Sequence, residues 1–492
     1  MPLTDLINLL DRWSPERVVV AGDFMLDRTT YGDAARLAPD APVPVLSAQR
    51  SEELPGGAGN VCVGLAALGC RAAALGVVGD DEAGRKLRDA LDAAGVDTAG
   101  LAAGPRPTTV KHSLVGLAQG RHAQKMFRFD TEDARPIPSA AEARLLEHAQ
   151  ELLEGAAVLC LEDYGKGVLT EALCRGLIGL AKRRGIPVLV DPPALGGYTK
   201  YRGATCLTPN RTEARRATGL DEPEAMARRL KADLDLSLVV LTLDKSGALL
   251  LDEHGRLHEV PTVPRRVYDV TGAGDTVLAT LAAAATQGAA WPDAVELANA
   301  AAGLAVEKPG ARPVGFDELW LSVLGRHRRE LGKPRTLTAL CRELEAHRKL
   351  GKSVVFTNGC FDVLHAGHVT MLRHAAQLGD LLVVGLNADA SIARLKGANR
   401  PVNPEADRRL VLSELESVDY VVGFERDTPI ELIEAIRPDV LVKGADYRID
   451  EVVGREAVEA YGGRVELIEL VQGKSTSALL EQTGGPSHTA NE

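Results

Sequence analysis

The stretch VYDVTGAGDTVLATLAAAA, residues 267–285, indicates an α/β fold with an anion site. Its Thr271-Gly-Ala-Gly-Asp275 turn lies between an apparent strand and an apolar helix. Glycines let the backbone approach a ligand closely, and free N–H groups at a helix start bind anions. Asp275 can therefore accept the proton of a substrate hydroxyl, and we expect the helix dipole to keep it ionised. The alternative is an ordinary helix N-terminus after a glycine turn.

A second glycine cluster, LPGGAGNVCVGLAALG at 54–69, also leads into a helix and places Asn60 in its first turn. GDFMLD at 22–27 follows a strand and offers Asp23 and Asp27. Two carboxylates and an amide at strand ends suit the several hydroxyls of a sugar. The alternative is that each aspartate caps the turn that follows it.

Short β-branched runs alternate with amphipathic stretches in the first half of the chain. Strands are predicted at 17–22, 73–79, 156–162, 186–191 and 236–243, and helices at 80–95, 170–185 and 275–288. This alternation predicts a doubly wound, mostly parallel sheet with helices on both faces. Three further strand-like runs, 42–49, 108–115 and 123–130, have no helices between them. They predict a small antiparallel sheet that serves as a lid or a dimer contact.

The composition excludes several classes of partner and location. The net charge of −11 argues against nonspecific binding to nucleic acid or to an anionic membrane. The N-terminus lacks a basic start and a long apolar core, and no run approaches the ~20 apolar residues of a membrane span. The seven cysteines form no CxxC pair and lie mostly in apolar runs. We therefore expect buried, reduced thiols in a cytoplasmic protein.

A polar, basic segment at 325–336 separates the two halves. We expect one domain at 1–322, a linker at 323–345, a second domain at 346–482 and a disordered tail at 483–492. In the second domain a new series of strands is predicted, which makes a five-stranded Rossmann-like sheet. These strands are 352–359, 380–387, 418–424, 439–444 and 464–470.

The second domain begins with VVFTNGCFDVLHAGHVTMLRHA, residues 354–375, which predicts a strand, a turn and a helix that starts near Gly367. His365 and His368 are three residues apart, so both can face one ligand at the helix start. Imidazolium or N–H donors there could stabilise charge on an α-phosphate under attack. One alternative is a metal site, although no third ligand is evident nearby. The other is a pair of capping or surface histidines.

The first half resembles the ribokinase-like carbohydrate kinase family over about residues 15–315, through GGAGN at 56–60 and DVTGAGD at 269–275. The resemblance implies phosphorylation of a sugar hydroxyl by ATP with Mg²⁺, Asp275 as base, and a monovalent cation as a possible further requirement. It implies an anion hole at Gly272, Ala273 and Gly274, sugar contacts from Asp23, Asp27, Gly56, Gly57, Asn60 and Lys166, and phosphate and Mg²⁺ positioning by Asn210 and Glu213. It implies no side chain bound directly to the metal.

TNGCFDVLHAGH resembles the HxGH nucleotidyltransferase superfamily. The resemblance implies in-line attack by a substrate phosphate on the α-phosphate of a nucleoside triphosphate, with His365 and His368 as catalytic residues and no covalent enzyme intermediate. The basic segment 394–409 is expected beside the triphosphate, although such a run is usually a solvated helix face. Implied nucleotide contacts are Thr357, Asn358, Cys360, Phe361, Lys396, Arg408, Ser475 and Thr476.

The order of the two halves resembles the family of fused heptose-7-phosphate kinases and heptose-1-phosphate adenylyltransferases, over about residues 10–482. The resemblance implies ATP and heptose phosphates as partners, ADP-heptose for the lipopolysaccharide core as product, and a homodimer through the kinase domain. A sugar with a distal phosphate needs a cation in the kinase site. The candidates are Lys111, Lys125, Arg128 and Lys166.

One departure bears on the sugar. The family has Asp-Pro-Lys after the strand at 186–191, whereas this chain has Asp191-Pro192-Pro193. A kinase for another sugar phosphate, fused to a cytidylyl- or other nucleotidyltransferase, is therefore one alternative. A nonenzymatic sensor of sugar phosphates or nucleotides is another, and the presence of Asp275 and both histidines argues against it.

Overall fold

The computed structural model describes residues 3–468 apart from 15, 118–122, 196, 263–265 and 446–447. The chain divides into two compact units, residues 1–319 and 320–492. Each unit is an α/β body with its own parallel or mostly parallel sheet. Among the described residues, the helices are too short or too polar to cross a lipid bilayer. All seven cysteines lie in the described ranges and are free thiols, five of them buried.

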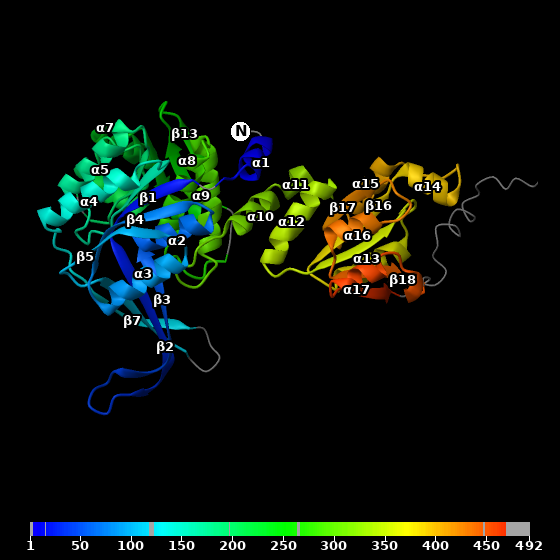
Figure 1. The fold of residues 1–492 in the computed structure, drawn as a ribbon, viewed down its shortest axis with the longest axis horizontal. Coiled ribbons are helices and arrows are strands. Elements are labelled where there is room, and N and C mark those ends of the chain that lie inside the picture. The colour runs from blue at the N-terminus through cyan, green and yellow to red at the C-terminus, as the bar shows by residue number, and fades with distance from the viewer. Residues whose placement is uncertain are drawn as a thin grey trace, which may run out of the picture. The chain divides into compact units, whose positions relative to one another are not determined.

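The body of unit 1 has a sheet whose described strands run in the order β13-β12-β11-β10-β9-β8-β1-β4-β5 (Figure 1). Neighbouring strands from β11 to β5 pair in parallel, and β12 is antiparallel to its two neighbours. The bounds are β1 (Arg17–Gly22), β4 (Arg71–Gly79), β5 (Asp97–Gly104), β8 (Val158–Glu162), β9 (Val188–Asp191), β10 (Cys206–Leu207), β11 (Leu238–Thr242), β12 (Ala248–Leu251) and β13 (Leu257–Val260).

Helices cover both faces of this sheet, which confirms the doubly wound prediction. In β1 the consecutive residues Val18, Val19 and Val20 are all fully buried, as expected for a strand covered on both sides. The helices of unit 1 are α1 (Leu3–Asp11), α2 (Ala58–Ala67), α3 (Glu82–Ala93), α4 (Ser139–Leu152), α5 (Glu171–Arg183), η1 (Tyr198–Tyr201), α6 (Arg211–Thr218), α7 (Pro223–Leu234), η2 (Asp244–Ser246), α8 (Ala273–Thr286) and α9 (Trp291–Ala305). The next helix, α10 (Phe316–Arg326), contains the boundary between the two units.

A separate sheet, which we call the lid sheet, projects from the body of unit 1 (Figure 1). Its described strands are β3 (Pro44–Gly57), β2 (Phe24–Leu37), β6 (Thr109–Gly116) and β7 (Gln124–Thr131), in that spatial order. The predicted antiparallel pairing holds between β6 and β7, whereas β2 lies between β3 and β6 and pairs with β6 in parallel, so the sheet is mixed. The 14-residue β2 was also missed, since its polar and glycine-containing sequence gives no clear apolar alternation.

Unit 2 has a parallel sheet with the described order β14-β17-β16-β15-β18-β19. Its strands are β14 (Pro334–Arg335), β15 (Val354–Gly359), β16 (Leu381–Asn387), β17 (Tyr420–Phe424), β18 (Val440–Gly444) and β19 (Arg464–Ile468). Its helices are α11 (Arg328–Leu331), α12 (Leu337–Lys349), α13 (Ala366–Ala376), α14 (Asp389–Lys396), α15 (Glu405–Ser413), α16 (Ile430–Ile436), η3 (Ile449–Glu451) and α17 (Arg455–Ala460). Val354 and Phe356 enter one apolar core and Val355 the other, on opposite sheet faces.

The expected linker at 323–345 is largely wrong. The segment contains α11, β14 and much of α12, and β14 adds a strand to the five predicted for the second sheet. Leu340 and Leu344 of α12 are fully buried in a core of unit 2. The polar, basic composition of 325–336 concealed these contacts, because the apolar residues that pack are few and widely spaced.

Candidate active sites

The predicted kinase residues meet at the carboxyl ends of β1, β8 and β9. The chain leaves β1 toward β4 and β5 on one side, while β8 and β9 lie on the other side. Such a reversal in strand order opens a crevice at the carboxyl edge of the sheet, where ligands of α/β proteins bind. Asp23 follows β1, Glu162 ends β8 and Asp191 ends β9. The helix α8 brings Asp275 to the same place, in its first turn.

Asp275 is a buried carboxylate with two side-chain donors. Its side chain is only 4% exposed. Asn60 Nδ2 donates to Asp275 Oδ2 at 2.6 Å, and the Tyr164 hydroxyl donates to Oδ1 at 2.9 Å. Burial raises the pKa of Asp275, and the bonds from Asn60 and Tyr164 oppose this effect. The ionisation of Asp275 is therefore governed mainly by burial and by these two donors.

The glycines of both signatures are required by close contacts. Gly272 has φ +77°, and a Cβ there would lie 2.7 Å from Asn60 Nδ2. Gly57 has φ +57°, and a Cβ there would lie 2.5 Å from the Asp23 carbonyl oxygen. A Cβ at Gly56 would lie 2.6 Å from Asp27 Cγ. Side chains at these positions would displace the Asp275 partner or the Asp27 carboxylate. The predicted anion hole at Gly272, Ala273 and Gly274 is at the start of α8, and its role stays a prediction.

Asp23 holds a loop and does not face a ligand. Its Oδ2 accepts the backbone N–H groups of Tyr164 and Lys166, each at 2.9 Å, and its Oδ1 accepts that of Val168 at 3.2 Å. The residue is 1% exposed, and burial raises its pKa to about 6. The structure therefore favours the capping alternative over the predicted sugar contact, because the three backbone donors occupy the carboxylate.

Asp27 is better placed to bind a sugar hydroxyl. It lies in β2 opposite Lys111 of β6, and its Oδ1 is buried without a hydrogen-bond partner among the described residues. Burial raises the pKa of Asp27 to about 6, with Lys111 lowering it and Asp275 raising it. A buried acceptor without a donor is costly, and a substrate hydroxyl would supply the donor.

Three carboxylates that are distant from one another in the sequence converge in the structure. Oxygens of Glu162, Asp191 and Asp275 all lie within 4.8 Å of one another. Burial raises the pKa values of Glu162 and Asp191 well above their usual range. Glu162 Oε2 is buried without a hydrogen-bond partner in the described structure. Carboxylate oxygens are the ligands that Mg²⁺ prefers, so this cluster fits a divalent cation and departs from the expectation of no direct protein ligand. Glu162 and Asp191 were missed because they are 29 residues apart and meet only through β8–β9 pairing.

Asn210 and Glu213 form a reciprocal capping box at the start of α6. Asn210 Oδ1 accepts the Glu213 N–H at 3.0 Å, and Glu213 Oε2 accepts the Asn210 N–H at 2.8 Å. Burial raises the pKa of Glu213, and Glu213 in turn raises that of Asp191. The pair is thus near the carboxylate cluster, as the predicted role near Mg²⁺ requires, although that role stays a prediction.

The four candidate cations for a distal phosphate differ in their partners. Lys166 Nζ forms an ion pair with Glu132 at 2.5 Å, and Lys125 Nζ forms one with Asp269 at 3.3 Å. The guanidinium of Arg128 donates two hydrogen bonds to the Asp130 carboxylate. Lys111 makes no such ion pair within the described structure, and its ammonium lies 4.0 Å from the centre of the Tyr164 ring. Pro193 occupies the position where the family has a lysine. Its carbonyl oxygen accepts a hydrogen bond from the Tyr198 hydroxyl at 3.1 Å.

The second site lies where the strand order of unit 2 reverses beside β15. Lys443 of β18 donates to Asn358 Oδ1 at 2.6 Å across this point. α13 starts at Ala366, which confirms the predicted helix start, with His365 as its N-cap. The rings of His365 and His368 stack with centroids 3.9 Å apart. Burial, and then His365 and Lys396, lower the pKa of His368 to about 4. His368 is therefore a neutral imidazole at pH 7. Of the two forms considered for this site, the neutral N–H donor is favoured over the imidazolium.

The Phe361 ring packs against His368 and is not placed as a direct contact for the nucleotide. Its backbone has φ +44°, a left-handed conformation that is costly for an aromatic residue. Its ring is 5% exposed and packs 5.2 Å from the His368 ring. Strain of this kind persists where surrounding structure imposes it, typically at ligand sites.

Arg408 corrects the predicted list of triphosphate contacts. It is 2% exposed and donates to the carbonyl oxygens of Cys360, Asn387 and Asn403 and to the Asp389 carboxylate. Because these bonds use its guanidinium inside the protein, Arg408 joins the loops around the site and does not face a phosphate. Thr357 is also turned inward, since its hydroxyl donates to the Val442 carbonyl oxygen at 3.0 Å.

Cys360 and Lys396 remain candidates for nucleotide contacts. Cys360 is half-buried in the turn after β15, and Lys396 is exposed at the end of α14. Ser475 and Thr476 lie outside the described residues.

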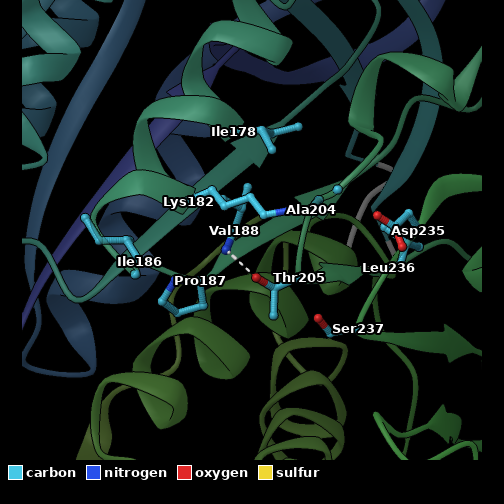
Figure 2. A pocket seen from close by; sticks show the side chains of 12 residues that line it. Ile178, Lys182, Ile186, Pro187, Val188, Ala204, Thr205, Asp235, Leu236 and Ser237 are labelled. Atoms are coloured by element: carbon cyan, nitrogen blue, oxygen red, sulfur yellow. Dashed lines mark hydrogen bonds between the residues drawn. The ribbon is translucent and has the colours of Figure 1, made fainter.

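A cavity of about 420 Å³ lies at the opposite edge of the first sheet (Figure 2). It is lined at the amino ends of β9, β10 and β11 by residues that include Lys182, Thr205 and Asp235. Thr205 Oγ1 accepts the Val188 N–H at 2.9 Å in its wall. None of the predicted catalytic residues lines this cavity, so it is distinct from the kinase site.

Comparisons with known proteins agree with the two sites. Residues 15–317 match the model of the pfkB family of carbohydrate kinases, and residues 356–479 match a cytidylyltransferase-like family. A relative named bifunctional protein HldE from Geobacter metallireducens is 45% identical over 469 residues, covering 94% of this chain and 95% of its own. Another, from Syntrophotalea carbinolica, is 44% identical over 488 residues, covering 98% of each chain.

Solved structures show the same fold for unit 1. Phosphofructokinase-2 from Escherichia coli, in complex with substrates and products, has a TM-score of 0.54 at 20% identity and covers 63% of this chain and 99% of its own. Ribokinase from Arabidopsis thaliana, complexed with ribose and ATP, has a TM-score of 0.50 at 22% identity, with the same coverage. The ribokinase-like prediction is thus confirmed. The chain belongs to the pfkB family of carbohydrate kinases through unit 1 and, over nearly its whole length, to the family of bifunctional HldE proteins, as an enzyme that joins a sugar kinase to a nucleotidyltransferase.

Proposed function

We propose that unit 1 transfers the γ-phosphoryl group of ATP to the anomeric hydroxyl of D-glycero-β-D-manno-heptose 7-phosphate. After a separate phosphatase removes the 7-phosphate, unit 2 joins heptose 1-phosphate to the AMP moiety of ATP and releases pyrophosphate. The product, ADP-heptose, is the heptose donor for the lipopolysaccharide core. The observation that carries the kinase step is the buried Asp275 carboxylate at the start of α8, beside the unpaired oxygen of Asp27.

In the kinase step, Asp275 takes the proton of the anomeric hydroxyl while that oxygen attacks the γ-phosphorus. The bond from the γ-phosphorus to ADP breaks, and backbone N–H groups at 272–274 stabilise the charge on the transferred group. Asp27 orients the sugar through a hydroxyl. When bound, Mg²⁺ would neutralise charge on the phosphates, and Glu162 and Asp191 are the side chains placed to hold it.

In the nucleotidyl step, an oxygen of heptose 1-phosphate attacks the α-phosphorus of ATP and the bond to pyrophosphate breaks. His365 and His368 donate to the α-phosphate at the start of α13, and no proton transfer is required. Asn358, Cys360 and Lys396 bind the nucleotide from the turn after β15 and the end of α14. We also propose nucleotide contacts from Ser475 and Thr476, which rest on the sequence alone.

The nucleotide preference is tested with the full chain, heptose 1-phosphate and ATP or CTP in parallel. Because the domain match is to a cytidylyltransferase-like family, CTP is the relevant competitor. We expect pyrophosphate release with ATP and at least about tenfold less with CTP, a difference of about 1.4 kcal/mol in transition-state stabilisation. Release with CTP alone would refute the adenylyltransferase assignment.

Lys111 is the proposed contact for the 7-phosphate, because the other three candidate cations already have carboxylate partners. We expect Lys111→Met to lower kcat/KM for heptose 7-phosphate by about 10–100-fold, as for loss of one charge-assisted hydrogen bond. The value for unphosphorylated heptose should change much less. Arg128→Met is the matched control on the same lid sheet, since its charge is engaged by Asp130. Equal losses for both sugars would remove Lys111 from phosphate recognition.

We also propose a cytoplasmic homodimer that pairs through the lid sheet. Support comes from β7, where the apolar side chains of Phe127 and Phe129 are 64% and 46% exposed on one face of the strand. Exposed aromatic residues two apart on an open strand are a typical contact surface between subunits.

A further inference from the structure

Tyr164 contacts the proposed base from a loop that the chain holds firmly. It follows Asp163 after β8, and its hydroxyl donates to Asp275 Oδ1 at 2.9 Å. Asn60 donates to the other oxygen at 2.6 Å, so each carboxylate oxygen has one side-chain donor. The two donors come from segments 104 residues apart, and together they fix the rotation of the carboxylate about its Cβ–Cγ bond.

Three contacts fix the Tyr164 ring itself. Its backbone N–H donates to Asp23 Oδ2 at 2.9 Å, and Asp23 also caps the N–H groups of Lys166 and Val168. The Lys111 ammonium lies 4.0 Å from the ring centre on one face. A Cβ at Gly57 would lie 3.4 Å from Tyr164 Cδ2, so the first glycine signature approaches the ring closely. The buried Asp23 thus contributes to the site indirectly, because it holds the backbone of Tyr164.

We propose that Tyr164 is the positioning residue of the kinase site, which holds the Asp275 carboxylate in the orientation that proton abstraction requires. The inference rests on the proposed function, in which Asp275 is the base. It adds a residue that neither glycine signature contains and assigns the loop after β8 to base positioning.

The physical need for such a donor follows from burial. A buried carboxylate oxygen without a donor is costly, and each of the two donors satisfies one oxygen of Asp275. A phenol–carboxylate bond in a site of low dielectric is stronger than the same bond in water.

Tyr164→Phe tests this directly, because it removes the hydroxyl and keeps the ring beneath Lys111. The full chain is assayed with heptose 7-phosphate and Mg-ATP from pH 5 to 9. We expect kcat to fall about 10–100-fold with little change in KM, as for loss of a hydrogen bond to a charged group. A loss confined to kcat indicates a misoriented base, because a general packing defect in the site would change KM as well.

Tyr201→Phe is the matched control. Tyr201 is also a buried tyrosine whose hydroxyl donates to a carboxylate, Asp163 Oδ2 at 2.6 Å, but it does not contact Asp275. Its kcat and KM should equal those of the wild type. A Tyr164→Phe variant with wild-type kcat, or with a loss carried by KM and not by kcat, would overturn the inference.

A second variant covers a folding defect in Tyr164→Phe. A fluorinated tyrosine at position 164 keeps both the ring and the hydroxyl, so it should keep kcat close to that of the wild type. A loss of kcat as large as that of Tyr164→Phe would overturn the inference, because the hydroxyl would then not be the group that matters. Asp275→Asn separates this inference from the proposed function: if that variant keeps wild-type phosphorylation, Asp275 is not the base and the function proposal fails first. If it is inactive while Tyr164→Phe keeps wild-type kcat, only the role of Tyr164 fails.

Discussion

Asp275→Asn is expected to lower kcat for sugar phosphorylation by about 10²–10⁴-fold, the range lost when a general base is removed. An asparagine keeps the shape and one oxygen acceptor, but it cannot take the hydroxyl proton. In the wild type, kcat should fall as the pH drops through the raised pKa of Asp275, because only the ionised form accepts a proton. The measurement is ADP release with heptose 7-phosphate across the pH range.

The second activity of the same molecule is the control for Asp275→Asn. Adenylyl transfer measured on the same sample reports the concentration of intact chain, and it should equal that of the wild type. Loss of both activities in a folded protein would contradict independent sites. Retained phosphorylation would contradict the assignment of Asp275 as base and leave Asp27 as the next carboxylate to test.

Local motifs led to the proposed centres of both sites because the residues concerned lie within one strand, turn and helix. The turn before Asp275 and the turn before His365 are each read from a dozen consecutive residues. Five strands of the second sheet and the parallel core of the first also follow from apolar runs that are buried on both faces. The ribokinase-like and nucleotidyltransferase folds could therefore be predicted without coordinates.

The residues that support these centres could not be predicted, because their roles depend on distant pairing. Tyr164 reaches Asp275 across 111 residues, and Glu162 meets Asp191 only through strand pairing. Arg408 was misassigned for the opposite reason. Its basic neighbours at 394–409 suggested a solvent-facing phosphate contact, whereas burial and four acceptors turn it inward.

The two proposed sites share an architecture and differ in their electrostatics. Both lie at the carboxyl edge of a parallel or mostly parallel sheet where the strand order reverses, and each has a helix start beside it, where a phosphate could bind. In the proposed kinase step a proton is removed, and the proposed base Asp275 is a buried carboxylate with two side-chain donors. In the proposed nucleotidyl step no proton is removed, and burial lowers the pKa of His368, which favours a neutral N–H donor.

His365→Ala and His368→Ala are each expected to lower kcat for adenylyl transfer by about 10²–10³-fold, as for removal of one donor to developing charge. Phosphorylation of heptose 7-phosphate by the same samples should be unchanged. His374→Ala is the matched control, because His374 lies exposed in the last turn of the same helix, away from the stacked pair. The measurement is pyrophosphate release from ATP with heptose 1-phosphate.

His368→Gln distinguishes the neutral donor from an imidazolium. With a pKa of about 4, the His368 ring carries no charge above about pH 5, so an amide N–H can replace part of its function. We expect His368→Gln to keep at least about tenfold more adenylyl transfer than His368→Ala, or about 1.4 kcal/mol of transition-state stabilisation. If the reaction needed a charged imidazole, the two variants would be equally inactive and wild-type kcat/KM would rise as the pH fell from 8 to 6. Since burial and the neighbouring His365 both oppose protonation, we expect no such rise.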